Sequence, residues 1–192
     1  MLSIRSKGKT FQVDSDIFSL ACSRTLRRMG SRIKTFSSSA IRDRYNINKN
    51  KVDPQMSLVP PSVKRLQVSL KVASTRMRVE DFGARYPTSP RAQRRAAGVS
   101  VEIIRGQRKL IKVPLNGRII GTFRGTVKGA QGVFARYQVG RRVHEVTTIG
   151  VVDMFRGSVI QTELDKFVDE TLPAELEHQV DFAIEQQSGA AE

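Results

Sequence analysis

The chain has 192 residues, of which 39% are hydrophobic, so it is long enough for one domain with an apolar core. No run approaches the roughly 20 apolar residues of a membrane span, and no signal-peptide core segment opens the chain. The single cysteine, Cys22, excludes an internal disulfide. Together these features indicate a protein of a reducing cytoplasm. Residues 1–146 carry 31 Lys and Arg against 8 Asp and Glu, whereas residues 147–192 carry 2 against 10, which predicts a polyanionic partner for the basic part and a separate role for the acidic end.

Residues 14–45 predict a long amphipathic helix. Apolar residues from Ile17 to Ile41 recur mostly at three- and four-residue steps, and Asp14 or Ser15 can cap the start. Gly30 and the serines at 37–39 have weak helix propensity and favour a bend. The polar face is basic, with Arg24, Arg27, Arg28, Arg32, Lys34, Arg42 and Arg44. A turn and a short helical piece are expected over residues 46–56.

A strand and a long loop follow. Residues 64–72 alternate apolar and polar side chains, which predicts a half-buried strand with a partly basic outer face. Residues 83–98 hold two prolines and four arginines, and a loop of about fifteen residues is usually functional or disordered. The arginines are Arg85, Arg91, Arg94 and Arg95. Burying them unpaired in an apolar core would be very costly, so we expect them to point outward.

The stretch from 99 to about 146 predicts an antiparallel meander. Turns are expected at Asn116-Gly117, the strongest short hairpin signal, at Gly129–Gly132 and at Gly140-Arg141. The glycines of "GRIIGTFRGTVKGAQGVFARYQVGRR" are therefore assigned mostly to turns and not to a phosphate-binding loop.

Residues 157–187 return to a helical pattern. The apolar stripe consists of Ile160, Leu164, Phe167, Val168, Leu172, Leu176, Val180 and Ile184. Pro173 fits either the first turn of a new helix or a kink in a continuous one. The expected fold is α+β, a single domain over residues 1–192. It has a long N-terminal helix, a meander sheet of about five strands over 64–150 with the basic loop 83–98, and C-terminal helices packed on that sheet.

The sequence contains no enzyme motif. A Walker-type loop needs Gly-Lys-Ser/Thr opening a helix, but Lys128 precedes Gly129 and strands flank both. The two histidines, His144 and His178, have no second histidine or cysteine at metal-ligand spacing, and Glu175 and Glu177 are interpreted as solvated. We therefore predict no catalytic, cofactor-binding or metal-binding residues. The absence of Trp and the few aromatic residues also disfavour a stacking platform for single strands.

Two stretches carry a family resemblance. They are "GTF…GVFARYQVGRRV" and the following "VIQTELDKFVDETLPAELEHQVDFAIEQ". After a long basic N-terminal helix, these two stretches resemble the minor tail protein Z family of long-tailed bacteriophages. The likeness covers roughly residues 14–187 and is clearest in Gly132–Val143 and Leu172–Val180.

The resemblance implies a structural virion protein, not an enzyme. It implies a ring, of six subunits in related tail-joining proteins, at the head-proximal end of the tail, with assembly in the host cytoplasm and no membrane. The implied partners are further copies of the chain, neck and tail proteins such as the tail terminator and tail tube, and packaged DNA. Arg85, Arg91, Arg94 and Arg95 are candidates for contact with DNA or a neighbour. Glu163, Asp165, Asp169 and Glu170 are candidates for a subunit interface.

Other interpretations of the sequence remain open. A sequence-independent nucleic-acid-binding protein of the ribosome-associated type would suit the basic charge and small size, although the acidic C-terminal helix suits it less. A phosphate-handling enzyme has only the glycines in its favour. The basic and acidic parts could also simply neutralise each other within a fold or an assembly.

Overall fold

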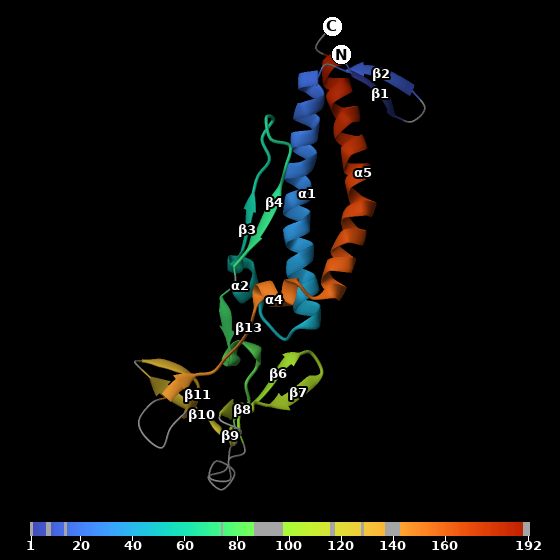
Figure 1. Ribbon diagram of the computed structural model, residues 1–192. Helices are drawn as coiled ribbons and strands as arrows, with labels where there is room; N and C mark the ends of the chain where they lie inside the picture. The colour runs from blue at the N-terminus through green and yellow to red at the C-terminus, as the bar shows by residue number, and fades with distance from the viewer. Residues whose placement is uncertain are drawn as a thin grey trace. The chain divides into compact units, whose positions relative to one another are not determined.

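The chain divides into two compact units (Figure 1). The first consists of Met1–Ser37, Met56–Lys71 and Gly157–Glu192, and the second of Ser38–Gln55 and Val72–Arg156. The computed structural model describes residues 2–6, 9–13, 15–73, 75–86, 98–115, 118–127, 129–136 and 143–189. The expectation of a single domain over residues 1–192 stays a prediction.

Helix α1, Ser15–Arg44, is the long N-terminal helix expected from the periodicity. It continues without interruption through Gly30 and the serines at 37–39. Gly30 has a packing role, because a Cβ placed there would lie 2.7 Å from Cγ2 of Val68. Because Gly30 has no side chain, the segment around Val68 can approach the helix closely at this position.

Helix α5, Ser158–Gly189, lies beside α1 in the first unit (Figure 1). Ala21 of α1 and Val180 and Ala183 of α5 form a buried apolar cluster. Farther along the pair, the rings of Phe36 and Phe167 stack with centroids 4.5 Å apart and planes inclined by 10°. The predicted C-terminal stripe is correct, but the surface it covers is helix α1 and not the predicted sheet.

Pro173 lies inside α5, so the residues on either side of it form one helix. Of the two alternatives, the start of a separate helix is therefore wrong. A short helix, α4 (Val151–Phe155), precedes α5 along the chain.

The first unit also contains two ribbons of strands. β1 (Leu2–Ser6) pairs antiparallel with β2 (Lys9–Val13), a ribbon that the sequence analysis did not predict. β3 (Met56–Val59) pairs with β4 (Ser69–Val72), which is shorter than the predicted strand 64–72. The shortening has a local cause, since Ser62 and Arg65 exchange backbone hydrogen bonds of 3.0 Å and turn the chain before Leu66, which is 45% exposed. The short helical piece expected before β3 is confirmed as α2 (Lys49–Val52) and η1 (Asp53–Gln55), which belong to the second unit.

The second unit does not contain the predicted five-strand meander. Its strands form several small antiparallel sheets: β5 (Arg76–Arg78) with β13 (Thr147–Gly150), β6 (Ser100–Ile104) with β7 (Gln107–Leu110), β8 (Val113–Leu115) with β9 (Arg118–Ile120), and β10 (Thr122–Val127) with β11 (Ala130–Arg136) and β12 (Val143–Glu145). A turn that the prediction missed, in which Gly106 has φ +75°, folds β6 back on β7. Each ribbon therefore closes locally, and the last strand pairs far back along the chain with β5.

The predicted turns are partly confirmed. The chain turns between Val127 of β10 and Ala130 of β11, which pair with each other, and Gly129 in this turn has φ +80°. The predicted Gly129–Gly132 turn was too wide, because Gly132 lies in β11 opposite Gly125. Asn116-Gly117 lies outside the described residues, although Leu115 pairs with Arg118 on either side of it. Gly140-Arg141 also lies outside the described residues.

The second unit has its own apolar core and a short η2 helix (Val79–Phe82). The buried apolar side chains that are at most 1% exposed include Phe82, Val99, Val133 and Val151. Arg78 ties the sheets together, because its guanidinium donates to the carboxylate of Glu145 and to the carbonyl of Gln131. The hydrogen bond to Glu145 raises the pKa of Arg78 above its ordinary value.

We predict that Gly30→Ala destabilises the protein. Alanine is favoured over glycine inside a helix by about 1 kcal/mol, but here its methyl group would overlap the stiff, β-branched Val68. We expect the free energy of unfolding in urea to fall by about 1 kcal/mol or more. In a Val68→Ala background the same change should stabilise the protein, because the obstructing methyl group is gone. Equal stabilisation in both backgrounds would contradict the close packing.

Candidate subunit interface

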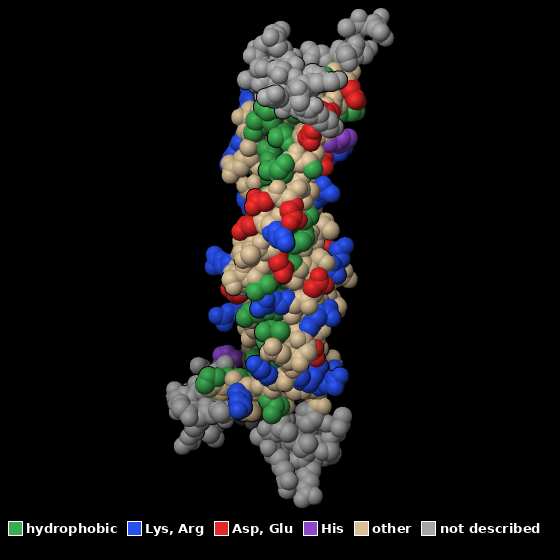
Figure 2. Space-filling model, turned by 90° about the vertical axis from the view of Figure 1, so that its right-hand side faces the viewer, with side chains coloured by type: hydrophobic (Ala, Val, Ile, Leu, Met, Phe, Trp, Pro, Cys, Tyr) green, Lys and Arg blue, Asp and Glu red, His purple; other side chains and the backbone are tan. Residues whose placement is uncertain are grey.

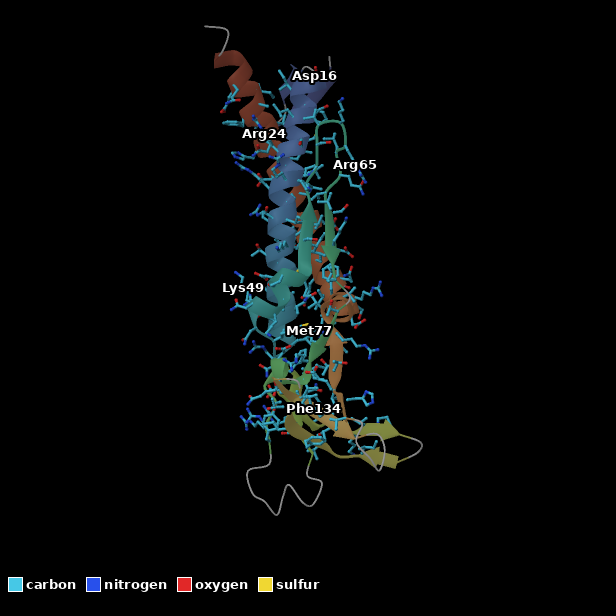
Figure 3. All side chains as sticks on the ribbon, turned by 90° about the vertical axis from the view of Figure 1, so that its left-hand side faces the viewer. Asp16, Arg24, Lys49, Arg65, Met77 and Phe134 are labelled. Carbon is cyan, nitrogen blue, oxygen red and sulfur yellow. The ribbon has the colours of Figure 1, made fainter. Side chains whose placement is uncertain are left out.

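Helix α1 carries a row of basic side chains on its solvent side within the first unit. Arg24, Arg27, Arg28 and Arg32 are exposed, as the polar face of the sequence predicted. Arg24, labelled in Figure 3, has its guanidinium carbon 6.0 Å from the centroid of the Phe182 ring of α5. Arg27 and Lys34 are seven residues apart and therefore share one side of the helix. We call Arg27 and Lys34 the basic flank.

Glu175 joins the two helices electrostatically. Its carboxylate accepts hydrogen bonds from Nη1 of Arg28 at 3.1 Å and from Nη1 of Arg32 at 3.3 Å. Nε2 of Gln179 donates to the same carboxylate at 3.3 Å. The Glu175 side chain is only 12% exposed, whereas the arginine side chains are 58% and 52% exposed. The interpretation of Glu175 as a solvated residue is therefore wrong.

A position between apolar neighbours explains the burial of Glu175. It falls between Leu172 and Leu176 on the stripe that faces α1. Helical spacing alone could have identified it as a half-buried acid, but the two arginines that it binds lie about 145 residues earlier in the chain.

The four predicted interface acids of α5 are all exposed, but they do not form one cluster. Glu163 and Glu170 are seven residues apart and share one side of the helix, whereas Asp165 and Asp169 are four apart and share another. The buried Ile160 lies between these two sides. Figure 2 shows acidic side chains exposed along the molecular face to which α5 contributes. We call the two pairs together the acidic flanks.

Most of the acidic flanks are not neutralised by described residues. Glu170 lies 3.9 Å from Nζ of Lys166, one helical turn away. Glu163, Asp165 and Asp169 form no ion pair with any residue in the described part of the chain. The acids are therefore available to a partner.

A shallow apolar notch of about 410 Å³ lies over the stacked phenylalanines. Its lining is Ser31, Arg32, Thr35, Phe36 and Phe167. Glu163 and Glu170 lie four residues before and three residues after Phe167, so they stand beside the notch on α5. The notch is thus lined by one basic side chain, Arg32 of α1, and its α5 wall, Phe167, has an acid one helical turn away on either side.

The predicted basic loop is described only at its beginning. Arg85 is exposed, and its backbone exchanges hydrogen bonds of 2.8 and 3.0 Å with Ser100. The next residue, Tyr86, donates to Glu80 at 2.7 Å, and burial together with this hydrogen bond raises the pKa of Tyr86 to about 12. The structure therefore fixes the chain at Arg85, whereas Arg91, Arg94 and Arg95 lie outside the described residues.

Other chemistry receives little support from the described residues. Among them, no group of three or more His, Cys, Asp and Glu side chains could hold a metal ion. In the same part of the chain no helix is long and apolar enough to cross a membrane. Cys22 is half-buried, and burial raises the pKa of its thiol, which lowers the fraction of reactive thiolate.

The fold is an α+β protein whose first unit presents a charged pair of long helices, a surface suited to association with other proteins. The family model of prophage minor tail protein Z (GPZ) matches residues 11–187, so the chain belongs to that family. It is a minor tail protein, a structural component of a phage tail. No curated protein and no solved structure matches the chain.

We predict that Glu175→Gln destabilises the helical pair. The amide keeps the size of the side chain but removes the charge that Arg28 and Arg32 share. Because both arginines are solvent-screened, we expect a loss of only about 1 kcal/mol, measured as a lower urea midpoint at unchanged slope. Asp169→Asn is the matched control, since Asp169 is exposed and unpaired with described residues. Equal midpoints for the two variants would contradict the assigned role.

Proposed function

We propose that the protein completes the head-proximal end of the tail as a ring of identical subunits around the DNA channel. In this ring, the acidic α5 of each subunit meets the basic flank of the next. The observation that carries the proposal is the presence of oppositely charged flanks on one pair of helices. Opposite potentials orient and accelerate association more than they add to affinity.

The arrangement of the flanks favours a ring over a two-fold dimer. The basic flank lies on α1 and the acidic flanks lie on α5, so contact between them joins two different surfaces. Interfaces between different surfaces propagate from head to tail and close into rings when the rotation permits. The apolar notch over Phe36 and Phe167 supplies a site where a neighbour's apolar side chain is removed from water.

The proposed role is structural and not enzymatic. Other neck and tail proteins, the tail terminator and tail tube among them, are the proposed neighbours, and the host cytoplasm is the proposed place of assembly. Membership of a tail protein family favours this role over that of a ribosome-associated nucleic-acid-binding protein. That alternative is supported only by the composition of the chain.

We predict that replacing the four acids of the flanks by lysine prevents assembly while the monomer stays folded. The variant combines Glu163→Lys, Asp165→Lys, Asp169→Lys and Glu170→Lys. All four side chains are exposed, so the helix content measured by circular dichroism should be unchanged. Light scattering after size exclusion should show loss of the oligomer. Testing the pairs 163/170 and 165/169 separately would identify which side of α5 makes the contact.

Mixing provides the control for this prediction. Arg27→Glu combined with Lys34→Glu reverses the basic flank and should also prevent assembly. A mixture of the two reversed variants should assemble, because each reversed surface then meets an oppositely charged one on its alternating neighbour. Normal assembly of the lysine variant alone would remove the proposal, and failure of the mixture would exclude the pairing of α5 with α1.

The arginines of the basic loop are proposed to bind a neighbouring protein rather than DNA, since a channel through which DNA slides gains little from gripping it. We predict that changing Arg85, Arg91, Arg94 and Arg95 to Ala lowers virion completion. Each phosphate contact contributes about −0.9 to the slope of log affinity against log salt on duplex DNA.

Salt dependence separates the two partners of this loop. Lost assembly with an unchanged DNA-binding slope would support the protein contact. A slope flattened by roughly three or four would instead indicate DNA. Unchanged assembly and unchanged slope would show that the loop is merely solvated.

A further inference from the structure

The second unit contains an open groove of about 960 Å³ that the proposed ring contact does not use. Two six-residue segments, Lys109–Pro114 and His144–Ile149, line it along their whole length. The remaining lining residues are Arg76, Val79, Val101, Ile103 and Asp153. All of these residues belong to the second unit.

The hydrogen-bonding edges of these two segments are the feature of the groove that matters for binding. Side chains alternate between the two faces of a strand, so a strand lying flat against a groove would contribute every second residue. Here consecutive residues line the groove, as is expected where a segment presents its backbone edge. The segments include parts of β7, β8, β12 and β13. Within the described residues β7, β8 and β13 belong to two-stranded sheets, and β12 is an outer strand of a three-stranded sheet. The backbone N–H groups of Ile111 and Val146 already donate to Val99 and Val133, at 2.9 and 2.8 Å. An added strand would therefore pair with the other edge of each segment, where an outer strand offers its N–H and C=O groups.

About half of the groove lining is apolar, and three of its other residues are exposed cations, which we call the rim cations. Nine of its 17 lining residues are apolar, and Leu110 is 55% exposed. Arg76, Lys109 and Lys112 are exposed and form no ion pair with a described residue.

The two acids of the lining are already engaged within the unit. Glu145 accepts from Arg78, and Asp153 accepts from the backbone N–H of Gly150 at 2.9 Å. The rim therefore presents net positive charge beside apolar surface, and a matching partner must combine apolar and acidic side chains.

We propose that this groove binds an extended segment of another protein, one in which apolar and acidic side chains alternate, as an added β-strand. In such a strand alternate residues point the same way, so the apolar set covers Leu110 and its neighbours while the acidic set meets the rim cations. The ladder with the groove edges supplies main-chain hydrogen bonds that depend little on sequence.

Neither a second copy of the chain nor DNA fits the groove as well. Eight of the chain's 18 acidic residues lie on α5, which is a helix and not an extended segment. Duplex DNA offers phosphates to the cations but nothing to the apolar lining. The inference concerns the second unit alone and stands independently of the ring.

The test uses the full chain and a fluorescent synthetic peptide that alternates valine and glutamate. We expect saturable binding by fluorescence anisotropy and slower amide hydrogen exchange in Leu110, Lys112 and Thr147–Ile149. A valine–lysine peptide should not bind. A valine–glutamate peptide N-methylated at alternate residues should bind at least about tenfold more weakly, because it lacks donors for the ladder.

Charge reversal locates the binding site. Combining Arg76→Glu, Lys109→Glu and Lys112→Glu should weaken binding by about tenfold or more, since three attractive contacts with the acidic side chains of the peptide become repulsive. The matched control combines Arg44→Glu, Lys64→Glu and Lys71→Glu, which changes the net charge equally at exposed positions outside the groove. Control binding should stay near that of the native chain.

Four results would overturn the inference. They are the absence of saturable binding, equal weakening by the two charge-reversed variants, undiminished binding of the N-methylated peptide, and protection of the groove amides by duplex DNA but not by the peptide. The N-methylated peptide needs no variant, so this arm decides the question even if a substituted chain fails to fold.

Discussion

The contact between α1 and α5 is the constraint on which the first unit depends. Helices of 30 and 32 residues with one apolar stripe each must cover that stripe, and each covers the other. The small residues Ala21 and Ala183 lie in the apolar cluster, the stacked Phe36 and Phe167 fix another level, and Glu175 adds charge at a half-buried position. With the apolar sides turned inward, the solvent sides are left for charged residues, which is why the flanks can differ in sign.

The charge asymmetry of the chain is only partly resolved within the molecule. Arg28 and Arg32 join the basic part of the sequence to the acidic part through Glu175. Three of the exposed acids on α5 have no such partner among the described residues. Neutralisation within the molecule therefore accounts for the carboxylate of Glu175. It leaves three exposed acids on α5 whose charge is explained best by contact with a neighbouring molecule.

The sequence predicted the helices far better than the sheets. A 3.6-residue period sustained over 30 residues gives a strong signal, so both α1 and the apolar stripe of α5 were located correctly. Hairpin turns are also local, and the turn between Val127 and Ala130 was predicted to within a few residues. The pairing of Thr147 with Arg78 joins strands about 70 residues apart, and no local pattern encodes it. For the same reason the arginines that bind Glu175, and the groove between two strand edges, could not be predicted.

Pro173 has a mechanical consequence for α5. Its ring nitrogen carries no hydrogen, so the carbonyl of Asp169 does not receive the backbone hydrogen bond that a residue four positions later normally donates in a helix. Because both residues are exposed, water can satisfy that carbonyl and the rod stays continuous. The rod is nevertheless softest at this point, and any bending load along it concentrates there. The segment before the proline carries the four flank acids together with Phe167, and the segment after it carries Val180 and Ala183. A small change in angle would therefore turn the charges and the Phe36–Phe167 contact together, relative to the apolar cluster of Ala21.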